Sequence, residues 1–496
     1  MFLTTRRLFT AILFLALFVM ATREIADPDF WWHLRTGQSI VETRTIPRAD
    51  IFSFTNAGRP WVAHEWLSEV SIYALYALGS FPTIIIAFAA IIALSFAFVY
   101  ARVPGKPYVA AFALLLAALA VAPTWGARPQ MLSLLLTSVF LYLLDKRRDL
   151  LGTLPLLMIL WVNLHSGYAL GLVIIAVHLF GEIVEYLASR FILRLRSGQA
   201  PHASRSPSPL PPRSLAPLRQ LAILFILCFV AVVVNPNGAT MYVYPFETLT
   251  SRTMQAYIQE WFSPDFHQFE FQPFAWLLIG TLAAMAFAGK RVSLTQTILL
   301  AGFGYAALRS ARNIPIFAII AAPILAEQLW YLIETRGWAN ALSSTHARVT
   351  RGMVIINWLV LLLIVAAGAA RVAMVVSNQR AVERAKYPAA AVDFLQAQKI
   401  SGALYNAYGW GGYLIWRLYP ETHVFIDGRA DVYGDAFIEE VYLKAYRGGA
   451  DWSAPLDQYD VRIVLVEPTA PLTVQLSREA EWNKVYADDQ AVIFTR

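Results

Sequence analysis

The chain has 496 residues, of which 58% are hydrophobic and 15% are charged. Soluble domains carry about 25% charged residues, so this composition excludes an ordinary soluble enzyme and indicates a membrane protein. The formal net charge of +7 does not indicate a nucleic-acid partner, because the basic residues lie mostly in short loops between apolar segments. The single cysteine, Cys228, excludes a disulfide within the chain.

Apolar segments recur along most of the chain. A membrane-spanning helix needs about 20 mostly apolar residues. The first segment could be a signal peptide, but the segments that follow favour an uncleaved anchor. We predict about eleven spanning helices, at residues 8–22, 81–101, 108–122, 129–144, 151–163, 167–188, 220–234, 272–289, 293–308, 314–335 and 353–372.

Basic residues fall on alternate sides of these segments, which is the pattern that sets orientation in a bilayer. It predicts a multi-pass membrane protein with the N-terminus in the cytoplasm. The cytoplasmic loop at residues 189–219 holds several arginines and no acidic residue. Its Ser- and Pro-rich composition predicts disorder. Residues 1–372 thus form a transmembrane domain, with residues 23–80 as its first extracytoplasmic loop.

The tail, residues 373–496, leaves the membrane and does not return. At this length it can form its own core. Alternation and turn signals predict an extracytoplasmic α/β domain. We expect helices at 388–398 and 434–446, strands at 423–426 and 461–466, and a hairpin of 484–486 with 491–495.

The first extracytoplasmic loop opens with Asp27-Pro28-Asp29-Phe30-Trp31-Trp32-His33. Pro28 disfavours helix at Asp27, which predicts a turn at the level of the lipid headgroups. Two carboxylates there could act as a general base, or could hold a divalent cation such as Mg²⁺ or Mn²⁺. We favour a functional role for Asp27 and Asp29. For the tryptophans we favour an ordinary interfacial aromatic belt.

Further polar residues gather at the outer ends of the predicted spans, and the cytoplasmic loops show no comparable mixture. Short helices that stop in polar residues are typical of a cavity, and a guanidinium binds phosphate in a bidentate manner. Single stretches could instead be tight turns, and an arginine could extend to the outer surface. The candidate substrate-binding residues are His33, His64, Glu65, Arg128, Asn163, His165, Asn235, Glu260, Arg309, Arg312 and Asn313.

A second candidate region lies in the tail. We expect a glycine- and aromatic-rich loop next to a strand that ends in an Asp-Gly-Arg-x-Asp segment, and this combination could bind an acceptor sugar by stacking and carboxylate hydrogen bonds. It could equally be turn chemistry, because Asp-Gly is a strong turn signal. The candidate acceptor-binding residues are Tyr408, Trp410, Asp427, Arg429 and Asp431.

In layout the chain resembles the GT-C class of membrane glycosyltransferases, which includes oligosaccharyltransferases, protein mannosyltransferases and aminoarabinose transferases. The resemblance lies in the acidic segment after the first span, the number of spans and the C-terminal α/β domain. It implies that Asp27 or Asp29 is catalytic or metal-binding, and that the sugar donor is a polyprenyl-phosphate lipid. The Asp-Pro-Asp-x-Trp-Trp-His and Trp-x-x-His-Glu-Trp segments are also similar to bacterial GT-C-like membrane proteins without an assigned function.

The resemblance implies an inverting sugar transfer to an acceptor, which could be a glycan, a lipid or a protein. The tail lacks the Trp-Trp-Asp-x-Gly motif of oligosaccharyltransferases, so we do not expect transfer to asparagine. A transporter or lipid flippase is an alternative that requires ionisable residues inside the spans, where only His178, Glu182 and Glu185 stand out. A non-catalytic assembly protein with a partner-binding tail is the third possibility.

Overall fold

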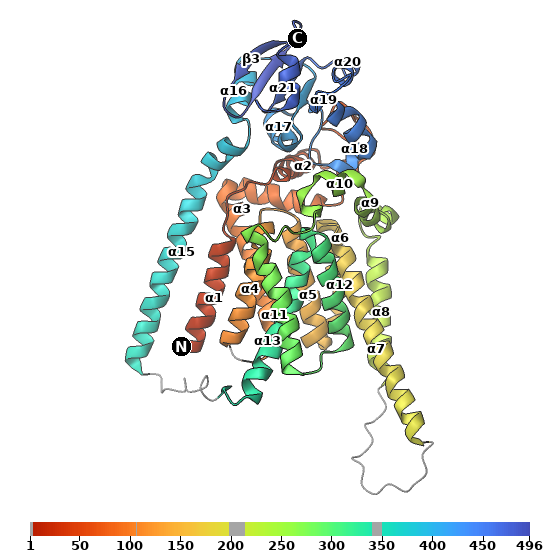
Figure 1. Cartoon of the computed structure of the whole chain (residues 1–496), viewed down its shortest axis with the longest axis vertical. Coiled ribbons are helices and arrows are strands. Elements are labelled where there is room, and N and C mark those ends of the chain that lie inside the picture. Colours follow the sequence, from red (N-terminus) through yellow and green to blue (C-terminus); the bar gives the residue numbers. More distant parts are fainter. Residues whose placement is uncertain (1–2, 106, 198–213, 340–349) are drawn as a thin grey trace.

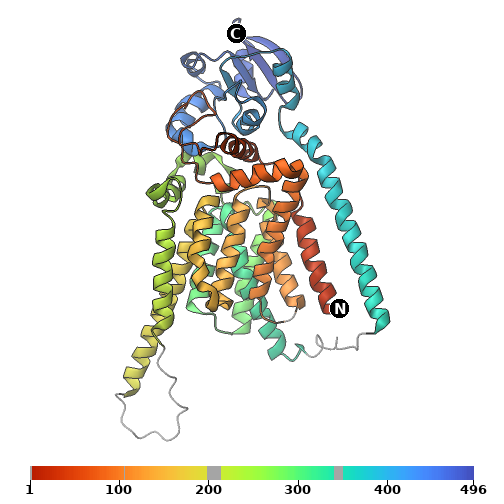
Figure 2. The ribbon, with the colours of Figure 1, turned by 180° about the vertical axis from the view of Figure 1, so that it is seen from behind.

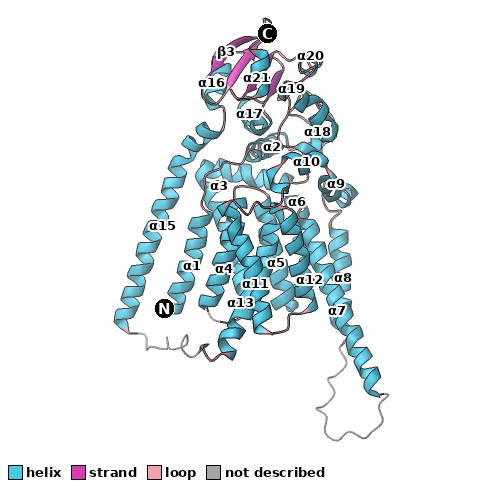
Figure 3. Cartoon of the chain, viewed as in Figure 1, coloured by secondary structure: helices cyan, strands magenta, loops and turns pink. Residues whose placement is uncertain are grey.

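The computed structural model describes residues 3–105, 107–197, 214–339 and 350–496. A bundle of helices carries a small domain at one end, and the chain between them forms a layer of short helices and loops (Figure 1). Strands occur in the described chain only within this small domain (Figure 3).

Every predicted span lies on a helix. The helices are α1 (Thr5–Ala21), α3 (Trp66–Arg102), α4 (Pro107–Val121), α5 (Gln130–Lys146), α6 (Leu154–Leu164), α7 (Tyr168–Ser197), α8 (Ala216–Ala231), α11 (Gln272–Ala288), α12 (Leu294–Arg309), α13 (Ile314–Thr335) and α15 (Arg351–Lys386). Residues 189–197, predicted as loop, continue α7 instead, and the central part of the predicted disordered loop (198–213) lies outside the described residues.

Six of the described helices are long and apolar enough to cross a membrane, namely Trp66–Arg102, Pro107–Thr124, Tyr168–Phe191, Phe269–Ala288, Ala311–Thr335 and Arg351–Lys386. The remaining predicted spans are shorter helices, such as α6 with 11 residues. The chain is therefore a multi-pass membrane protein, and the predicted count of crossings is not confirmed.

Helix α3 bends where the backbone leaves helical geometry at Gly79 and Ser80. The residues before the bend lie across the end of the bundle, and those after it run down into the bundle (Figure 2). This bend places the first turns of α3 directly beneath the C-terminal domain. Glu69, in those turns, is 1% exposed.

A proline in α13 shows how a charged side chain is accommodated among the spans. Pro323 lies inside α13 and has no N–H to donate to the carbonyl four residues earlier. That carbonyl, of Ile319, accepts a hydrogen bond from Arg102 Nη1 at 2.8 Å. Arg102 also pairs with Asp145 at 2.8 Å. The guanidinium thus satisfies the backbone group that the proline leaves without a donor.

The acidic segment after α1 is a turn at Asp27, as predicted, and α2 (Asp29–Thr43) begins immediately after Pro28. The interfacial-belt interpretation of the tryptophans is wrong. Trp31 is fully buried, and its ring lies 5.4 Å from that of Tyr387 and 5.0 Å from that of Tyr413, measured between centroids. The C-terminal domain covers this helix, so the rings pack against protein instead of meeting lipid headgroups.

The C-terminal domain contains a four-stranded sheet in the order β1-β2-β4-β3, in which β1 and β2 are parallel and the other pairs antiparallel. The predicted strand at 461–466 and the predicted hairpin are confirmed. The strands are β1 (Leu404–Asn406), β2 (Ile463–Val466), β3 (Asn483–Ala487) and β4 (Val492–Thr495), and the main helices are α16 (Ala389–Ala397), α17 (Gly411–Leu418), α18 (Ala430–Phe437), α19 (Leu443–Tyr446), α20 (Ala454–Gln458) and α21 (Pro471–Leu476).

Two expectations for this domain are wrong in detail. The predicted strand at 423–426 is a single bridge at Val424, which pairs with Ser53 of the first loop and with Leu404 of β1. The glycine-rich segment after Tyr408 is helix α17, not a loop. The first loop therefore extends the sheet of the C-terminal domain, so the edge next to Val424 is occupied.

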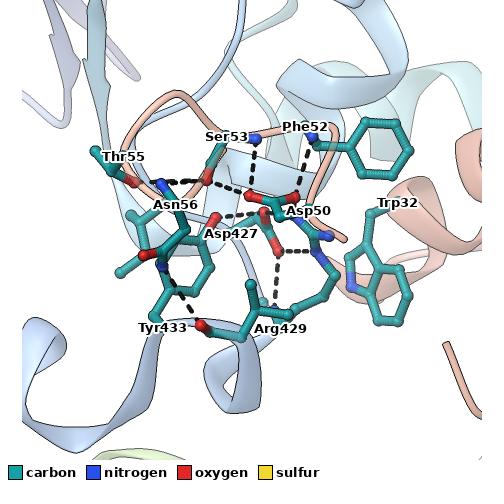
Figure 4. A network of polar contacts seen from close by, with 12 residues as sticks. Trp32, Asp50, Phe52, Ser53, Thr55, Asn56, Asp427, Arg429 and Tyr433 are labelled. Atoms are coloured by element: carbon teal, nitrogen blue, oxygen red, sulfur yellow. Dashed lines mark hydrogen bonds and ion pairs between the residues drawn. The ribbon is translucent and has the colours of Figure 1, made fainter. Parts of the chain in front are cut away.

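A buried polar network holds the same interface (Figure 4). Arg429 Nη2 donates to Asp50 Oδ1 at 2.8 Å and to Asp427 Oδ2 at 2.7 Å, and Tyr433 Oη donates to Asp427 Oδ2 at 2.6 Å. Asp50 also accepts hydrogen bonds from the backbone and hydroxyl of Ser53. The first loop and the C-terminal domain are thus joined by paired, buried charges.

Candidate active site

A cavity of about 210 Å³ lies at the end of the bundle next to the C-terminal domain. Five of the predicted residues line it, although they come from separate loops and helix ends, and most of the remaining lining is apolar. The predicted residues at this cavity are Arg128, His165, Glu260, Arg312 and Asn313. Arg309 is exposed and is not among the residues that line it.

Arg128 connects this cavity to the acidic segment of the first loop. Its Nε pairs with Asp27 Oδ2 and its Nη1 with Glu260 Oε1, while Nη2 donates to Glu260 Oε2 at 3.3 Å. Glu260 belongs to a short 3₁₀ helix. Its backbone carbonyl accepts a hydrogen bond from Ser310 Oγ at 2.9 Å. Burial opposes ionisation of Glu260, but Arg128 and Arg312 outweigh it and hold its pKa below the usual value.

Asp29 lies next to this ion-pair network, at the start of α2. Its backbone N–H donates to Asp27 Oδ1 at 2.9 Å, and its Oδ1 accepts from Trp32 Nε1 at 3.2 Å. Burial, followed by the charge of Asp27, raises the pKa of Asp29 to about 7, against the opposing charge of Arg128. A carboxylate with a pKa near 7 exchanges protons efficiently at neutral pH.

Glycines of the C-terminal domain allow its backbone to lie directly on the acidic segment. A Cβ at Gly428 would lie 1.8 Å from Asp29 Oδ1, and one at Gly412 would lie 2.5 Å from the Pro28 carbonyl oxygen. A side chain at Gly412 would therefore meet backbone, and one at Gly428 would displace the Asp29 carboxylate. The clustered glycines at 409–412 and the Asp-Gly pair are the signals in the sequence that could have indicated this close approach.

A second buried group surrounds Glu65. His64 Nε2 lies 2.8 Å from Glu65 Oε1, while the Nε2 atoms of His33 and His165 each lie 3.7 Å from a Glu65 oxygen. Glu69, which the sequence analysis missed, lies 3.4 Å from His33 Nδ1. Its position one helical turn after Glu65 places both carboxylates on one face of the chain's entry into α3.

The charges in this group support one another. Burial lowers the pKa of His64, but the Glu65 carboxylate outweighs burial and raises it above the usual value. The pKa of His33 is also raised, because Glu69 and Glu65 outweigh its burial. Burial raises the pKa of Glu65, whereas the charge and hydrogen bond of His64 outweigh burial and bring it below the usual range.

His165 differs from its neighbours because it is held neutral. Its Nδ1 accepts a hydrogen bond from the Gly167 N–H at 2.9 Å and lies 2.8 Å from Ser133 Oγ, which itself accepts from Trp161 Nε1 at 2.7 Å. This network assigns the proton to Nε2. Burial, together with Arg312 and against Glu65, lowers the pKa to about 3. The buried Nε2 has no hydrogen-bond partner among the described residues.

Other predicted residues serve the fold. Asn163 Oδ1 accepts from Trp66 Nε1 at 2.7 Å, and Asn163 Nδ2 donates to the Val234 carbonyl at 2.7 Å. Asn235 Nδ2 donates to the Val162 carbonyl at 2.9 Å. These amides tie the ends of α6 and α8 together, and their hydrogen-bonding groups are used in doing so.

The candidate acceptor residues of the tail do not form one open surface. Asp427 and Arg429 are buried in the interface network, where each neutralises the charge of the other. Trp410 is also buried, with 7% of its surface exposed. Asp431 is exposed and accepts a hydrogen bond at 3.1 Å from Tyr244 Oη, whose ring lies 4.3 Å from that of His64, measured between centroids. Tyr408 Oη donates to the Gly428 carbonyl at 3.3 Å.

The predicted divalent cation does not fit the arrangement of Asp27 and Asp29. Both oxygens of Asp27 are engaged, one by Arg128 and one by the Asp29 N–H. Within the ranges that the structure describes, no three His, Cys, Asp or Glu side chains are placed to hold a metal ion. Hard cations require several free oxygen ligands, but Arg128 and the Asp29 N–H occupy both oxygens of Asp27, and Trp32 Nε1 occupies Asp29 Oδ1.

No protein-family model matches the sequence, and no curated protein matches it. The structure is similar to the apo oligosaccharyltransferase of Archaeoglobus fulgidus, with a TM-score of 0.51 and 12% identity over 93% of this chain and 70% of that one. A crystal structure of the same enzyme tethered to an acceptor peptide containing the NVT sequon gives a TM-score of 0.53, 12% identity and coverage of 94% and 69%. ArnT from Cupriavidus metallidurans gives 0.48 and 17% identity, with coverage of 98% and 97%. At these identities the likeness is one of fold, and the chain has the fold of the oligosaccharyltransferase, as its resemblance to the GT-C class predicts.

Proposed function

We propose that the protein is a membrane glycosyltransferase that moves a sugar from a polyprenyl-phosphate donor to an acceptor hydroxyl on the extracytoplasmic face of the inner membrane. The observation that carries the proposal is the position of Asp29, whose pKa is about 7, beside the Asp27–Arg128 ion pair. Arg128 and Arg312 line the cavity, whereas Asp29 is not among its lining residues. The fold shared with an oligosaccharyltransferase supports it.

In the proposed reaction Asp29 accepts the proton of the acceptor hydroxyl. The acceptor oxygen then attacks the anomeric carbon while the bond from that carbon to the phosphate oxygen breaks. The donor phosphodiester leaves as a phosphomonoester and gains one negative charge. Attack from the face opposite the phosphate inverts the anomeric configuration. Asp29 suits the role of general base because it is partly exposed and its pKa lies near the working pH.

The cavity supplies charge for the departing phosphate. Arg128 and Arg312, which both line it, provide guanidinium groups. Donors already placed where charge develops lower the barrier, because they do not have to reorganise during the reaction. The apolar remainder of the lining, which includes Leu134, Leu170 and Ile316, suits the first isoprene units of the lipid.

Radiolabelled polyprenyl-phosphate sugar added to membranes tests this function. Membranes with the wild-type protein transfer label to a lipid, glycan or protein fraction, and membranes with Asp29→Asn do not. The matched control is Asp489→Asn, which neutralises an exposed carboxylate in the hairpin loop of the tail. Equal transfer by wild type and Asp29→Asn would remove Asp29 from the reaction. Absence of transfer from every donor tested would remove the proposed class of reaction.

The transport alternative receives less support from the cavities. The ionisable residues that it requires, His178, Glu182 and Glu185, line a cavity of about 620 Å³ at the opposite end of the bundle, together with Arg102 and Asp145. This cavity shares no lining residue with the candidate active site among the described residues. A transporter needs a path that joins the two sides, so a one-sided reaction explains the arrangement better.

A further inference from the structure

Arg128 occupies the position between carboxylates that a catalytic cation would need. Its fork joins Asp27 on one side and Glu260 on the other, and its charge also acts on Asp29. A divalent cation in a phosphate-transfer site neutralises the substrate phosphate while protein carboxylates hold it. A guanidinium has five N–H donors and a permanent charge, so it can remain fixed by two carboxylates and still direct donors to a phosphate.

His165, which is among the residues that line the cavity, is in the wrong tautomer to hold a metal through Nε2. A histidine that binds metal through Nε2 donates its Nδ1–H to a carbonyl or carboxylate. Here the Gly167 N–H points at Nδ1, at 2.9 Å, so Nδ1 must be the acceptor and Nε2 carries the proton. That Nε2–H is buried without a hydrogen-bond partner in the described structure, and a Glu65 oxygen lies 3.7 Å from it, so His165 offers no metal ligand at Nε2.

We propose that Arg128 replaces the divalent cation, so that this site binds its phosphate-bearing donor without metal, through the Arg128 guanidinium. The inference rests on the proposed function for the identity of the ligand, but its statement about metals does not. It also assigns Arg128 a second role: the guanidinium keeps Asp27 and Glu260 from acting as cation ligands.

The second role predicts that removing the Arg128 guanidinium creates a binding site for a divalent cation. In Arg128→Gln, Asp27 and Glu260 lose their shared positive partner while Asp29 remains beside them. Carboxylates brought together without a counter-charge favour a cation with oxygen ligands. The variant should therefore bind a divalent cation that the wild type does not. The double variant Asp27→Asn/Arg128→Gln should lose this gained binding.

Two measurements on the full chain in neutral detergent test the proposal. In the first, Mn²⁺ is titrated at concentrations up to about 0.1 mM, the tight end for extracellular cation sites, and free Mn²⁺ is followed by electron paramagnetic resonance. In the second, farnesyl phosphate binding is measured by calorimetry with EDTA and with Mg²⁺. The control is Arg59→Gln, which removes an exposed arginine of the same loop region, and thermal unfolding of each variant verifies folding.

The proposal expects no stoichiometric Mn²⁺ binding by the wild type, binding by Arg128→Gln, and none by the double variant. Farnesyl phosphate should bind the wild type equally with EDTA and Mg²⁺, and at least about tenfold more weakly to Arg128→Gln, the loss expected for a charged hydrogen bond. Stoichiometric Mn²⁺ binding by the wild type, absence of Mn²⁺ binding by Arg128→Gln, or loss of farnesyl phosphate binding in EDTA would overturn it. If the wild type binds no farnesyl phosphate in either condition, the proposed donor fails, while the Mn²⁺ titration still decides the role of Arg128.

Discussion

Removal of the positive charge from the buried interface should separate the C-terminal domain from the first loop. In Arg429→Met, Asp50 and Asp427 stay buried and lose the guanidinium that lies 2.8 and 2.7 Å from their oxygens. Loss of one partner from a buried ion pair costs about 3–5 kcal/mol. Two carboxylates are left uncompensated here, so we expect the upper part of that range.

Hydrogen exchange measures this loss directly. The Phe54 N–H donates to the Val424 carbonyl at 3.2 Å, and the Val424 N–H donates to the Phe52 carbonyl at 3.1 Å. Both amides lie on the interface, so their protection reports its opening free energy. Arg429→Met should lower that free energy by about 3–5 kcal/mol, whereas amides of β2 and β4 should change little.

The pH dependence of the interface stability should have opposite signs in the wild type and in Arg429→Met. In the wild type, burial opposes ionisation of Asp427, but Arg429 outweighs it and holds its pKa below the usual value. The interface is therefore stabilised above the unfolded pKa of about 3.9, and it weakens as the pH falls through the folded value. In Arg429→Met, burial alone raises the pKa of Asp427, so the interface should weaken as the pH rises.

A neutral triple variant, Asp50→Asn/Asp427→Asn/Arg429→Met, provides the control. It removes all three charges and should recover part of the lost protection, because the loss in the single variant arises from uncompensated charge. A loss below about 1 kcal/mol in Arg429→Met, the size of an exposed ion pair, or the same pH slope in both proteins, would refute the electrostatic account of the interface.

Three further outcomes follow from the site. Transfer activity of the wild type should rise with pH and level off above about 7, because Asp29 must be deprotonated to accept a proton and its pKa is about 7; a rate–pH profile checks this. Gly428→Ala should lower transfer about tenfold or more, because its Cβ would lie 1.8 Å from Asp29 Oδ1. The hydrogen-exchange protection of the interface should stay as in the wild type. Arg312→Gln should weaken farnesyl phosphate binding more than Arg309→Gln does, because only Arg312 lines the cavity.

Local sequence determined the features that depend on neighbours along the chain. The apolar runs became helices, and the hairpin of β3 and β4 formed about its Asp-Asp turn, because hydrophobic periodicity and turn chemistry act over a few residues. Pro28 kept Asp27 out of the helix for the same reason. Several of the predicted polar residues likewise meet at one end of the bundle, because the loops alternate between its two ends.

Tertiary structure decided which of these polar residues meet. Sequence could not show that Arg128 pairs with Asp27 and Glu260, since these residues lie on three separate loops. Nor could it show that Asp427 and Arg429 are buried, because an Asp-Gly-Arg segment looks the same in an exposed turn. Long-range packing sets burial and charge pairing, and these in turn set the pKa of Asp29 and the tautomer of His165.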